Sequence, residues 1–498
     1  MSGASDSEAR EFAQAFRSFL EWVHSDAAQR NRNEVVALVA DFLGEDARRH
    51  SVVTRSLPVF EPVNLQTALL AWSVEPKREV EVRGITIPPH HGGVTLQQIV
   101  GNNGVHALSL SPPPLVDLPN GPGSTLACLN LGLLLVSDEL GRYVVMVNGP
   151  GEHDPSLDLE IAGLAVDHAQ AVHARLDSLR RELNVYRGHL LEVDTTPMGA
   201  IVLHFAAPSG LQREDVILPA EVLERVERHA LGVAAHRDAL LSSGQHLKRG
   251  LLLYGPPGTG KTHTTRYLVG QMPGYTRFVL TGRALRVIGP AAEMARELQP
   301  SALILEDVDL VAEERTHGPG SSPVLFDLLD AMDGAAGDAD LLFLLTTNRA
   351  DLLEPALAAR PGRVDIAVQI KLPEAGARRA LLELYGHSLD LRLSGAEIDD
   401  VVERTQGVTA SFIKELLRRA VLESLIERDG QTGPVEPAHM RRALDDLMDA
   451  SQEVTRSLLG VGDERENLPA GGGLGSLPPQ GGGVWLSGRA AARLRSDR

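Results

Sequence analysis

Cysteine is almost absent from this chain of 498 residues, which contains only Cys128. A single thiol cannot close an intrachain disulfide or build a cysteine zinc cluster, so an oxidising, secreted environment is not indicated. Long apolar runs are also missing, because the longest, residues 126–136, has about half of the ~20 residues needed to cross a bilayer. The opening residues, MSGASDSEAREF, lack the cationic and apolar regions of a signal peptide. We therefore expect a cytoplasmic protein without a membrane span.

Cations and aromatic rings are also scarce. The chain has 48 Lys and Arg residues against 66 Asp and Glu residues, a net charge of −18, and only 4% aromatic residues. Nucleic-acid binding relies on cations that contact phosphates and on rings that stack on bases, so nucleic acid is not the expected partner. The remaining composition, 43% hydrophobic and 23% charged, is typical of a folded chain. At roughly 150 residues per domain, the length suggests about three domains.

The first 215 residues contain helical and strand patterns without a catalytic motif. Phe12 and Phe16 begin an apolar stripe at helical spacing that residues 35–43 repeat, so residues 1–50 are predicted to form N-terminal helices. Residues 51–215 are predicted to form an α+β region. Its predicted elements are a helix at 64–72, a strand at 80–82, a hairpin of 131–136 with 143–147, a helix at 164–183, and strands at 189–193 and 201–205.

From residue 216 onward, strand and helix patterns alternate, which is typical of a parallel sheet. We assign residues 216–372 to a large α/β domain and residues 373–460, with apolar pairs at helical spacing, to a helical domain. Residues 461–498 contain two GGG runs and a PPQ, and they bury too little apolar surface to fold, so a flexible tail is predicted. Trp485 in this tail is interpreted as part of an incidental apolar cluster rather than a docking motif.

An apolar run at residues 251–254 leads directly into a glycine-rich loop and then into a helical stretch. G-x-x-x-x-G-K-T in this strand–loop–helix setting is a phosphate-binding motif, because its glycines let backbone N–H groups face a phosphate chain at the positive end of the helix. The lysine can reach the β- and γ-phosphates, and the threonine can bind Mg²⁺. The predicted nucleotide-binding residues are Gly255, Pro256, Pro257, Gly258, Thr259, Gly260, Lys261, Thr262 and His263.

Two further apolar strands end in polar side chains. Residues 302–305 lead into Glu306 and Asp307, and residues 341–345 lead through two threonines into Asn348. Because the carboxyl ends of parallel strands meet at one edge of a sheet, these side chains are expected beside the phosphate loop. One carboxylate can hold the Mg²⁺ shell and the other can polarise the attacking water, while the amide lies where a γ-phosphate would be.

Taken in order, GPPGTGKT, LILEDVD, TTN and PALAARPGRVD resemble the motifs of the AAA+ ATPases. They are most similar to the branch that includes membrane-protein translocases, protein unfoldases and disassembly machines. The resemblance covers about residues 216–460. It implies an α/β fold with a P-loop parallel sheet and a helical lid, here preceded by an α+β N-terminal region and followed by the tail.

The resemblance also implies roles for individual residues. Lys261 and Thr262 would form the Walker A pair, Glu306 and Asp307 the Walker B pair, and Asn348 would be sensor 1. Thr262 and Glu306 would hold Mg²⁺, and ATP would be the bound nucleotide.

Two arginines and one turn complete the resemblance. Arg360 and Arg363 look like the arginine fingers, which in this family reach the nucleotide of the neighbouring subunit, so a homo-oligomer, expected to be a hexamer, is implied. Residues 407–411 stand where the family has a turn near the nucleotide.

The sequence departs from the family pattern at two places. Glu306 and Asp307 reverse the common Asp-Glu order, a form similar to the mitochondrial Bcs1-like subgroup, whose membrane anchor this chain does not show. Val287, Ile288 and Gly289 stand where translocating members have an aromatic pore loop. We expect Val287 and Ile288 to lie on a loop that faces a central channel, but without the aromatic grip.

The leading hypothesis is an oligomeric, Mg·ATP-dependent ATPase that remodels or disassembles proteins, with residues 1–215 recognising a client or adaptor. A slow nucleotide-dependent regulatory switch is the alternative, and a nucleic-acid motor or loader is a weaker one. Proteolysis by this chain is not expected, because H-E-x-x-H is absent. His90 and His91 lack further ligands at workable spacing and are expected on a solvated loop.

Overall fold

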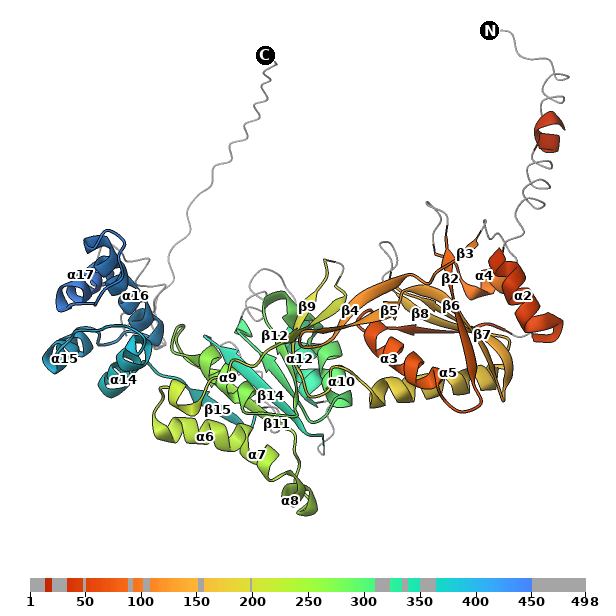
Figure 1. The fold of residues 1–498 in the computed structure, drawn as a ribbon. Helices are drawn as coiled ribbons and strands as arrows, with labels where there is room; N and C mark the ends of the chain where they lie inside the picture. The colour runs from red at the N-terminus through yellow and green to blue at the C-terminus, as the bar shows by residue number, and fades with distance from the viewer. Residues whose placement is uncertain are drawn as a thin grey trace, which may run out of the picture.

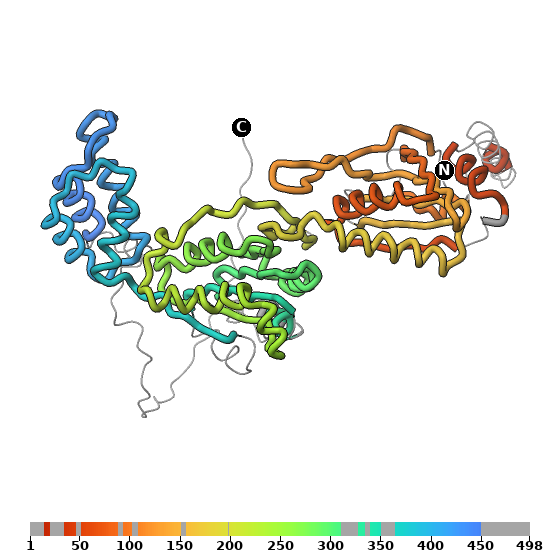
Figure 2. The backbone as a smooth tube through the Cα atoms, turned by 60° about the horizontal axis from the view of Figure 1, so that its bottom comes forward, coloured from red at the N-terminus to blue at the C-terminus, as the bar shows by residue number. Residues whose placement is uncertain are grey.

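The part of the chain that the structure describes contains two large β-sheets, a separate two-stranded sheet and a group of helices (Figure 1). Figure 2 shows the N-terminal unit, the second sheet unit and the helical unit in a row along the molecule. The predictions for His90, His91 and Trp485 fall outside the described residues. The computed structural model describes residues 14–19, 34–47, 51–87, 93–101, 108–150, 156–197, 199–309, 323–333, 339–349 and 364–449.

The N-terminal unit confirms the predicted mixture of helices and strands. Residues 14–19 are helical, and the predicted hairpin is the antiparallel pair β6–β7. The elements of this unit are α2 (Glu34–Ala47), β1 (Val53–Leu57), α3 (Pro62–Ser73), β2 (Glu79–Thr86), α4 (Leu96–Gly101), β3 (Ser109–Ser111), β4 (Leu115–Gly121), β5 (Ser124–Leu129), β6 (Leu131–Asp138), β7 (Gly141–Asn148), β8 (Leu157–Ala162) and α5 (Val166–Glu182).

Helices cover both faces of the first sheet, whose strand order is β1-β8-β7-β6-β2-β3. Leu134 and Val136 of β6 belong to the apolar cluster that includes residues of α3 and α5. Leu133 and Leu135 belong to the cluster of α2 and α4. Because neither face of β6 meets solvent, the strand can be almost continuously apolar, which explains the long run noted in the sequence.

The second sheet carries the predicted phosphate loop. Its elements are β9 (Leu190–Thr195), β10 (Ile201–Ala206), the 3₁₀ turn η1 (Arg213–Asp215), α6 (Ala220–Ala230), α7 (Gly232–Ala235), α8 (Arg237–Ser242), β11 (Arg249–Tyr254), α9 (Lys261–Gly270), β12 (Thr276–Leu280), the 3₁₀ turn η2 (Gly282–Val287), α10 (Ile288–Glu297), β13 (Ser301–Leu305), α12 (Pro323–Asp333), β14 (Leu341–Thr347) and β15 (Ile366–Gln369).

The strand order of the second sheet is β10-β9-β12-β13-β14-β11-β15, and every neighbouring pair is parallel except β10–β9. β9 and β10 therefore belong to this sheet, although they precede the boundary that the sequence suggests at residue 216. Their strand pattern is visible in the sequence, but the partner strand is not, since β9 pairs with the later β12. One face of the sheet packs against α6 and α9, and the other packs against η2, α10 and α12.

The helical unit follows β15. It contains α14 (Ala375–Gly386), α15 (Gly395–Arg404), α16 (Ala410–Glu427) and α17 (Pro437–Met448), which share one apolar cluster. These helices fall within the region that the sequence predicts as helical.

Specific contacts join the N-terminal unit to the second sheet. The Tyr186 hydroxyl donates to the carbonyl oxygen of Phe60 at 2.7 Å, and the backbone N–H of Val185 donates to Asn64 Oδ1 at 2.9 Å. Cys128 of β5 is buried in the same apolar cluster as the β9–β10 hairpin, and burial raises the pKa of its thiol to about 11. A thiol with such a pKa stays protonated near neutral pH, so Cys128 acts as a core residue.

Candidate functional site

The glycine-rich loop lies between β11 and α9, as the motif predicts. Gly255 has φ 148°, and a Cβ at this position would lie 2.1 Å from the carbonyl oxygen of Ile370. Gly258 has φ 75°, and its Cβ would lie 3.0 Å from the Ser411 hydroxyl. Glycine is required where the backbone is left-handed and a neighbour is this close, so the loop is tightly held between β15 and α16.

Lys261 begins α9 and is buried within the loop. Its Nζ donates to the carbonyl oxygens of Gly255 at 2.8 Å and Pro256 at 2.9 Å, and to Asn348 Oδ1 at 2.6 Å. Burial lowers the pKa of Lys261, and the nearby Asp307 carboxylate opposes this shift. The structure thus brings together the lysine of the loop and the amide at the end of β14, which lie far apart in the sequence.

The other loop residues take supporting positions. The Thr259 hydroxyl donates to the Pro256 carbonyl oxygen at 2.9 Å, Pro257 is exposed, and Thr262 is half-buried at the start of α9. His263 Nε2 lies 2.9 Å from the carbonyl oxygen of Asp215, so this side chain links α9 to η1.

Glu306 and Asp307 follow β13, and each carboxylate interacts with a different cation. Asp307 interacts with Lys261, whereas Glu306 interacts with Arg266 on α9. Burial raises the pKa of both carboxyl groups. Asp307 has φ 52°, a left-handed conformation that Asp adopts more readily than most residues.

Asp309 fixes the end of β14, a role that the motif pattern does not reveal. Its Oδ1 accepts hydrogen bonds from the Thr347 hydroxyl at 2.9 Å and from the backbone N–H of Asn348 at 3.1 Å. Thr346 accepts a hydrogen bond from the backbone N–H of Asp307 at 3.0 Å. These contacts hold the Asn348 backbone against the segment that carries the acids.

The helical unit contacts the phosphate loop directly. The backbone N–H of Ser411 donates to the carbonyl oxygen of Gly258 at 3.1 Å, and the Ser411 hydroxyl lies 3.3 Å from the same oxygen. Thr409 accepts a hydrogen bond from the backbone N–H of Phe412 at the start of α16. The turn at residues 407–411 therefore lies where the sequence predicts it.

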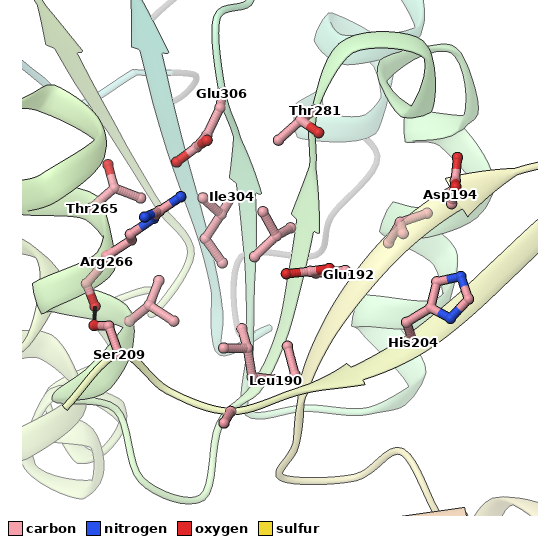
Figure 3. A pocket seen from close by; sticks show the side chains of 15 residues that line it. Leu190, Glu192, Asp194, His204, Ser209, Thr265, Arg266, Thr281, Ile304 and Glu306 are labelled. Carbon is pink, nitrogen blue, oxygen red and sulfur yellow. Dashed lines mark hydrogen bonds between the residues drawn. The ribbon is translucent and has the colours of Figure 1, made fainter. Parts of the chain in front are cut away.

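A cavity of about 620 Å³ lies on the other side of Glu306, between α9 and the β9–β10 hairpin. Figure 3 shows Glu306 and Arg266 at one end, Asp194 and His204 at the other end, and Glu192 between them. This cavity was not predicted from the sequence. One available signal was the alternation of polar and apolar residues along β9.

The prediction that Ile288 lies on an exposed pore loop is wrong. This side chain is 2% exposed and belongs to the apolar cluster between the sheet, α10 and α12, and Val287 packs against the same cluster. The segment folds as the 3₁₀ turn η2 followed by α10, and this places Ala284, Leu285 and Ile288 on the buried side. Arg360 and Arg363 lie outside the described residues.

Comparisons with known proteins place the phosphate loop and the two strand ends within the match to one protein family. Residues 251–372 match the family described as ATPase family associated with various cellular activities (AAA). The chain is 32% identical over 238 residues to the ATP-dependent zinc metalloprotease FtsH of Mesoplasma florum, covering 45% of this chain and 34% of that protein. It is 30% identical over 207 residues to the 26S proteasome regulatory subunit 8 homolog of Schizosaccharomyces pombe, covering 39% and 51%. The homolog of Saccharomyces cerevisiae is 27% identical over 310 residues, covering 59% and 73%.

The chain spans about a third to a half of the length of the first two relatives. The family match runs from β11 to just beyond β15 and includes the loop, both acids and Asn348, which confirms the resemblance and the α/β fold that the sequence predicts. Among the helices that the structure describes, none combines the length and the apolar character needed to cross a membrane.

Proposed function

Because the chain carries an AAA-family ATPase domain, we propose that it binds Mg·ATP and hydrolyses it to ADP and phosphate. The observation that carries this proposal is the meeting of Lys261 with Asn348 at the phosphate loop, with Asp307 close to the lysine. A cation, an amide and a carboxylate at one sheet edge are the groups that phosphoryl transfer to water requires. The loop amides and Lys261 would hold the phosphates, and Thr262 has the chemistry to bind Mg²⁺.

Different tasks are proposed for the two acids. Asp307 lies in the field of Lys261, so it would polarise the attacking water, and Asn348 would orient that water or the γ-phosphate. Glu306, with its longer side chain, would complete the Mg²⁺ shell. Mg²⁺ is expected to supply charge stabilisation of the leaving phosphate.

Nucleotide titration tests the binding part of this proposal. A fluorescent ATP analogue is expected to saturate the full chain with Mg²⁺ present and to bind more weakly when Mg²⁺ is chelated. Identical binding curves with and without Mg²⁺ would contradict the assigned metal site.

We also infer a homo-oligomer, expected to be a hexamer, that acts on proteins. The support is the family and two relatives named as a proteasome regulatory subunit and an ATP-dependent protease. Arg360 and Arg363 would then complete the site of a neighbouring copy. Mixing Arg363→Ala chains with Lys261→Ala chains should restore part of the hydrolysis that each variant lacks, and mixtures as inactive as their components would contradict action between copies.

A protein client or adaptor is proposed for residues 1–215. An Asp307→Asn chain should hold ATP and retain its client in a pull-down. The comparison chain should begin at residue 184, since a cut at 215 would remove β9 and β10 from the second sheet. Equal recovery of the same proteins by both chains would exclude the N-terminal unit as the recognition element.

The slow regulatory switch is the second candidate, and one observation favours it. Ile288 is buried in the core, so the segment that resembles a pore loop does not present its apolar residues for gripping an extended polypeptide. A switch would show ATP-dependent assembly with turnover that added client does not accelerate.

A further inference from the structure

The relative position of Asp307 and Asn348 is not set by strand pairing alone. β13 and β14 are parallel neighbours, and the register of their pairing ends at Leu305 and Leu345, before either residue is reached. Hydrogen bonds beyond the paired residues therefore decide how the carboxylate and the amide of the proposed ATP site lie relative to each other. These bonds come from two buried side chains, one on each segment.

Asp309 holds the backbone of the β14 segment. Its side chain is 6% exposed, and its Oδ1 accepts hydrogen bonds from the Thr347 hydroxyl at 2.9 Å and from the Asn348 backbone N–H at 3.1 Å. A buried carboxylate is stable only where hydrogen bonds replace its water. The same two bonds that stabilise Asp309 therefore fix the backbone from which the Asn348 amide projects.

Thr346 holds the backbone of the β13 segment in the opposite direction. It is fully buried, and its hydroxyl oxygen accepts a hydrogen bond from the Asp307 N–H at 3.0 Å, while its carbonyl oxygen accepts one from the Val308 N–H at 3.0 Å. Asp307 has φ 52°, and a residue other than glycine keeps such a conformation only where its surroundings hold it. Thr346 supplies these contacts on both sides of the Asp307 carbonyl group.

The two backbones carry the side chains that meet Lys261. The Asn348 Oδ1 accepts a hydrogen bond from the Lys261 Nζ at 2.6 Å, and the Asn348 Nδ2 lies 3.5 Å from the Asp307 Oδ1. The amide thus lies between the cation and the carboxylate. A misplacement of about 1 Å at a reacting centre can lower a rate by roughly 10²-fold, so small movements of either backbone matter for hydrolysis.

Asp309 differs from Asp307 in its surroundings. Asp307 is half-buried, whereas Asp309 is buried and its Oδ1 already accepts two hydrogen bonds. A general base must come within hydrogen-bond reach of the water that it polarises. The accessible carboxylate suits that role, and the enclosed carboxylate suits the role of holding a backbone.

We propose that Asp309 and Thr346 are positioning residues that form a strand-end clamp: each holds the backbone of the other segment, and together they set Asn348 and Asp307 for hydrolysis. This inference rests on the proposed ATP hydrolysis. The clamp acts on turnover and leaves ATP binding, which depends on the phosphate loop and Lys261, nearly unchanged.

Steady-state hydrolysis and ATP-analogue titration of the full chain test the role of Asp309. Asp309→Ala removes the acceptor, so kcat should fall by about tenfold or more while analogue affinity stays within about threefold of wild type. Asp309→Asn keeps an oxygen that can accept both hydrogen bonds, so it should retain turnover within about threefold. Asp330→Ala, at an exposed carboxylate on α12, is the control and should change neither quantity.

A matched pair at Thr346 guards against misfolding of Asp309→Ala. Thr346→Val keeps the shape of the side chain but removes the hydroxyl that accepts from the Asp307 N–H, so kcat should fall while analogue affinity is retained. Thr346→Ser keeps the hydroxyl and should turn over ATP faster than Thr346→Val. A role in packing alone would give the reverse order, because serine lacks the methyl group.

Amide hydrogen exchange measures the clamp without nucleotide. Asp309→Ala should accelerate exchange at the Asn348 N–H, Thr346→Val should accelerate it at the Asp307 N–H, and Asp330→Ala should do neither. Unchanged exchange at both amides, or unchanged turnover in both variants, overturns the proposal. Asp309→Asn as slow as Asp309→Ala also overturns it, because the charge would then matter instead of the hydrogen bonds.

Failure of the clamp can be told apart from failure of the proposed function. A wild-type chain that hydrolyses no ATP would refute the proposed function, and the exchange rates would still show whether Asp309 and Thr346 hold the two backbones. A wild-type chain that hydrolyses ATP, with variants that match it, would refute the clamp alone.

Discussion

β6 and β7 of the first sheet differ from β9 of the second sheet in how completely other elements cover them. In the first sheet, β6 and β7 are buried on both faces and carry apolar residues at successive positions. In the second sheet, β9 is buried on one face and lines a polar cavity on the other, and β13 ends in two acids. The comparison teaches that strands buried on both faces contribute mainly stability, whereas strands with a polar face or polar residues at their ends can supply groups for a functional site.

Lys261→Ala should have the largest effect, on ATP binding at the loop that the second sheet carries. It removes the lysine that the loop holds among its carbonyl oxygens, so ATP binding should fall below detection while the fold is retained. Titration with an ATP analogue and a circular dichroism spectrum provide the measurement. Lys371→Ala, at an exposed lysine after β15, is the control. Unchanged affinity in Lys261→Ala would refute the assigned role.

Asp307→Asn should separate binding from turnover. General-base assistance contributes roughly 10²–10⁴-fold to rate, so hydrolysis should fall by about that factor while ATP affinity is retained. Steady-state turnover and analogue titration measure the two quantities. Asp238→Asn on α8, at an exposed carboxylate, should change neither. Near-normal turnover in Asp307→Asn would move the water-polarising role to Glu306 or Asp309.

Leu135→Ala should damage the first sheet through stability. Leu135 lies on β6, is 3% exposed and belongs to the same apolar cluster as residues of α2. Truncating a core leucine lowers the free energy of unfolding by about 2–5 kcal/mol. Val279→Ala, at the half-buried cavity wall of β12, should cost less. Denaturant unfolding of both variants provides the comparison. Equal losses would show that the second sheet is packed as tightly at the cavity as the first is at its core.

Glu160→Gln should have the smallest effect, and it depends on pH. Burial raises the pKa of Glu160 above its ordinary value of 4.5, although its carboxylate accepts a hydrogen bond from the N–H of Leu96. The stabilisation from the protonated form is therefore present below pH 4.5 and is lost as pH rises through the folded pKa. The variant should become more stable relative to wild type over that window. A stability difference that is flat with pH would contradict the burial effect.

The predictable parts of the molecule are those in which neighbours in sequence are also neighbours in space. The predicted phosphate loop is contiguous from Gly255 to Thr262, so its spacing alone predicts a loop between a strand and a helix. The β6–β7 hairpin has the same advantage. The strand–loop–helix arrangement of the first segment and the pairing of the second were both predicted correctly.

The parts that could not be predicted depend on distant partners. The β9 pattern identifies a strand, but its pairing with β12 decides which sheet it joins. Ile288 was expected on an exposed loop, because glycines and arginines surround it, yet a 3₁₀ turn directs it into the core. The contact of Asp309 with Thr347 and the approach of Arg266 to Glu306 join separate elements, so no local pattern reveals them.

The most direct test of the central claim is the rate of phosphate release from ATP by the purified full chain. The account predicts saturable, Mg²⁺-dependent release that Lys261→Ala abolishes and Lys371→Ala leaves intact. Equal release by the wild-type chain and Lys261→Ala would contradict it.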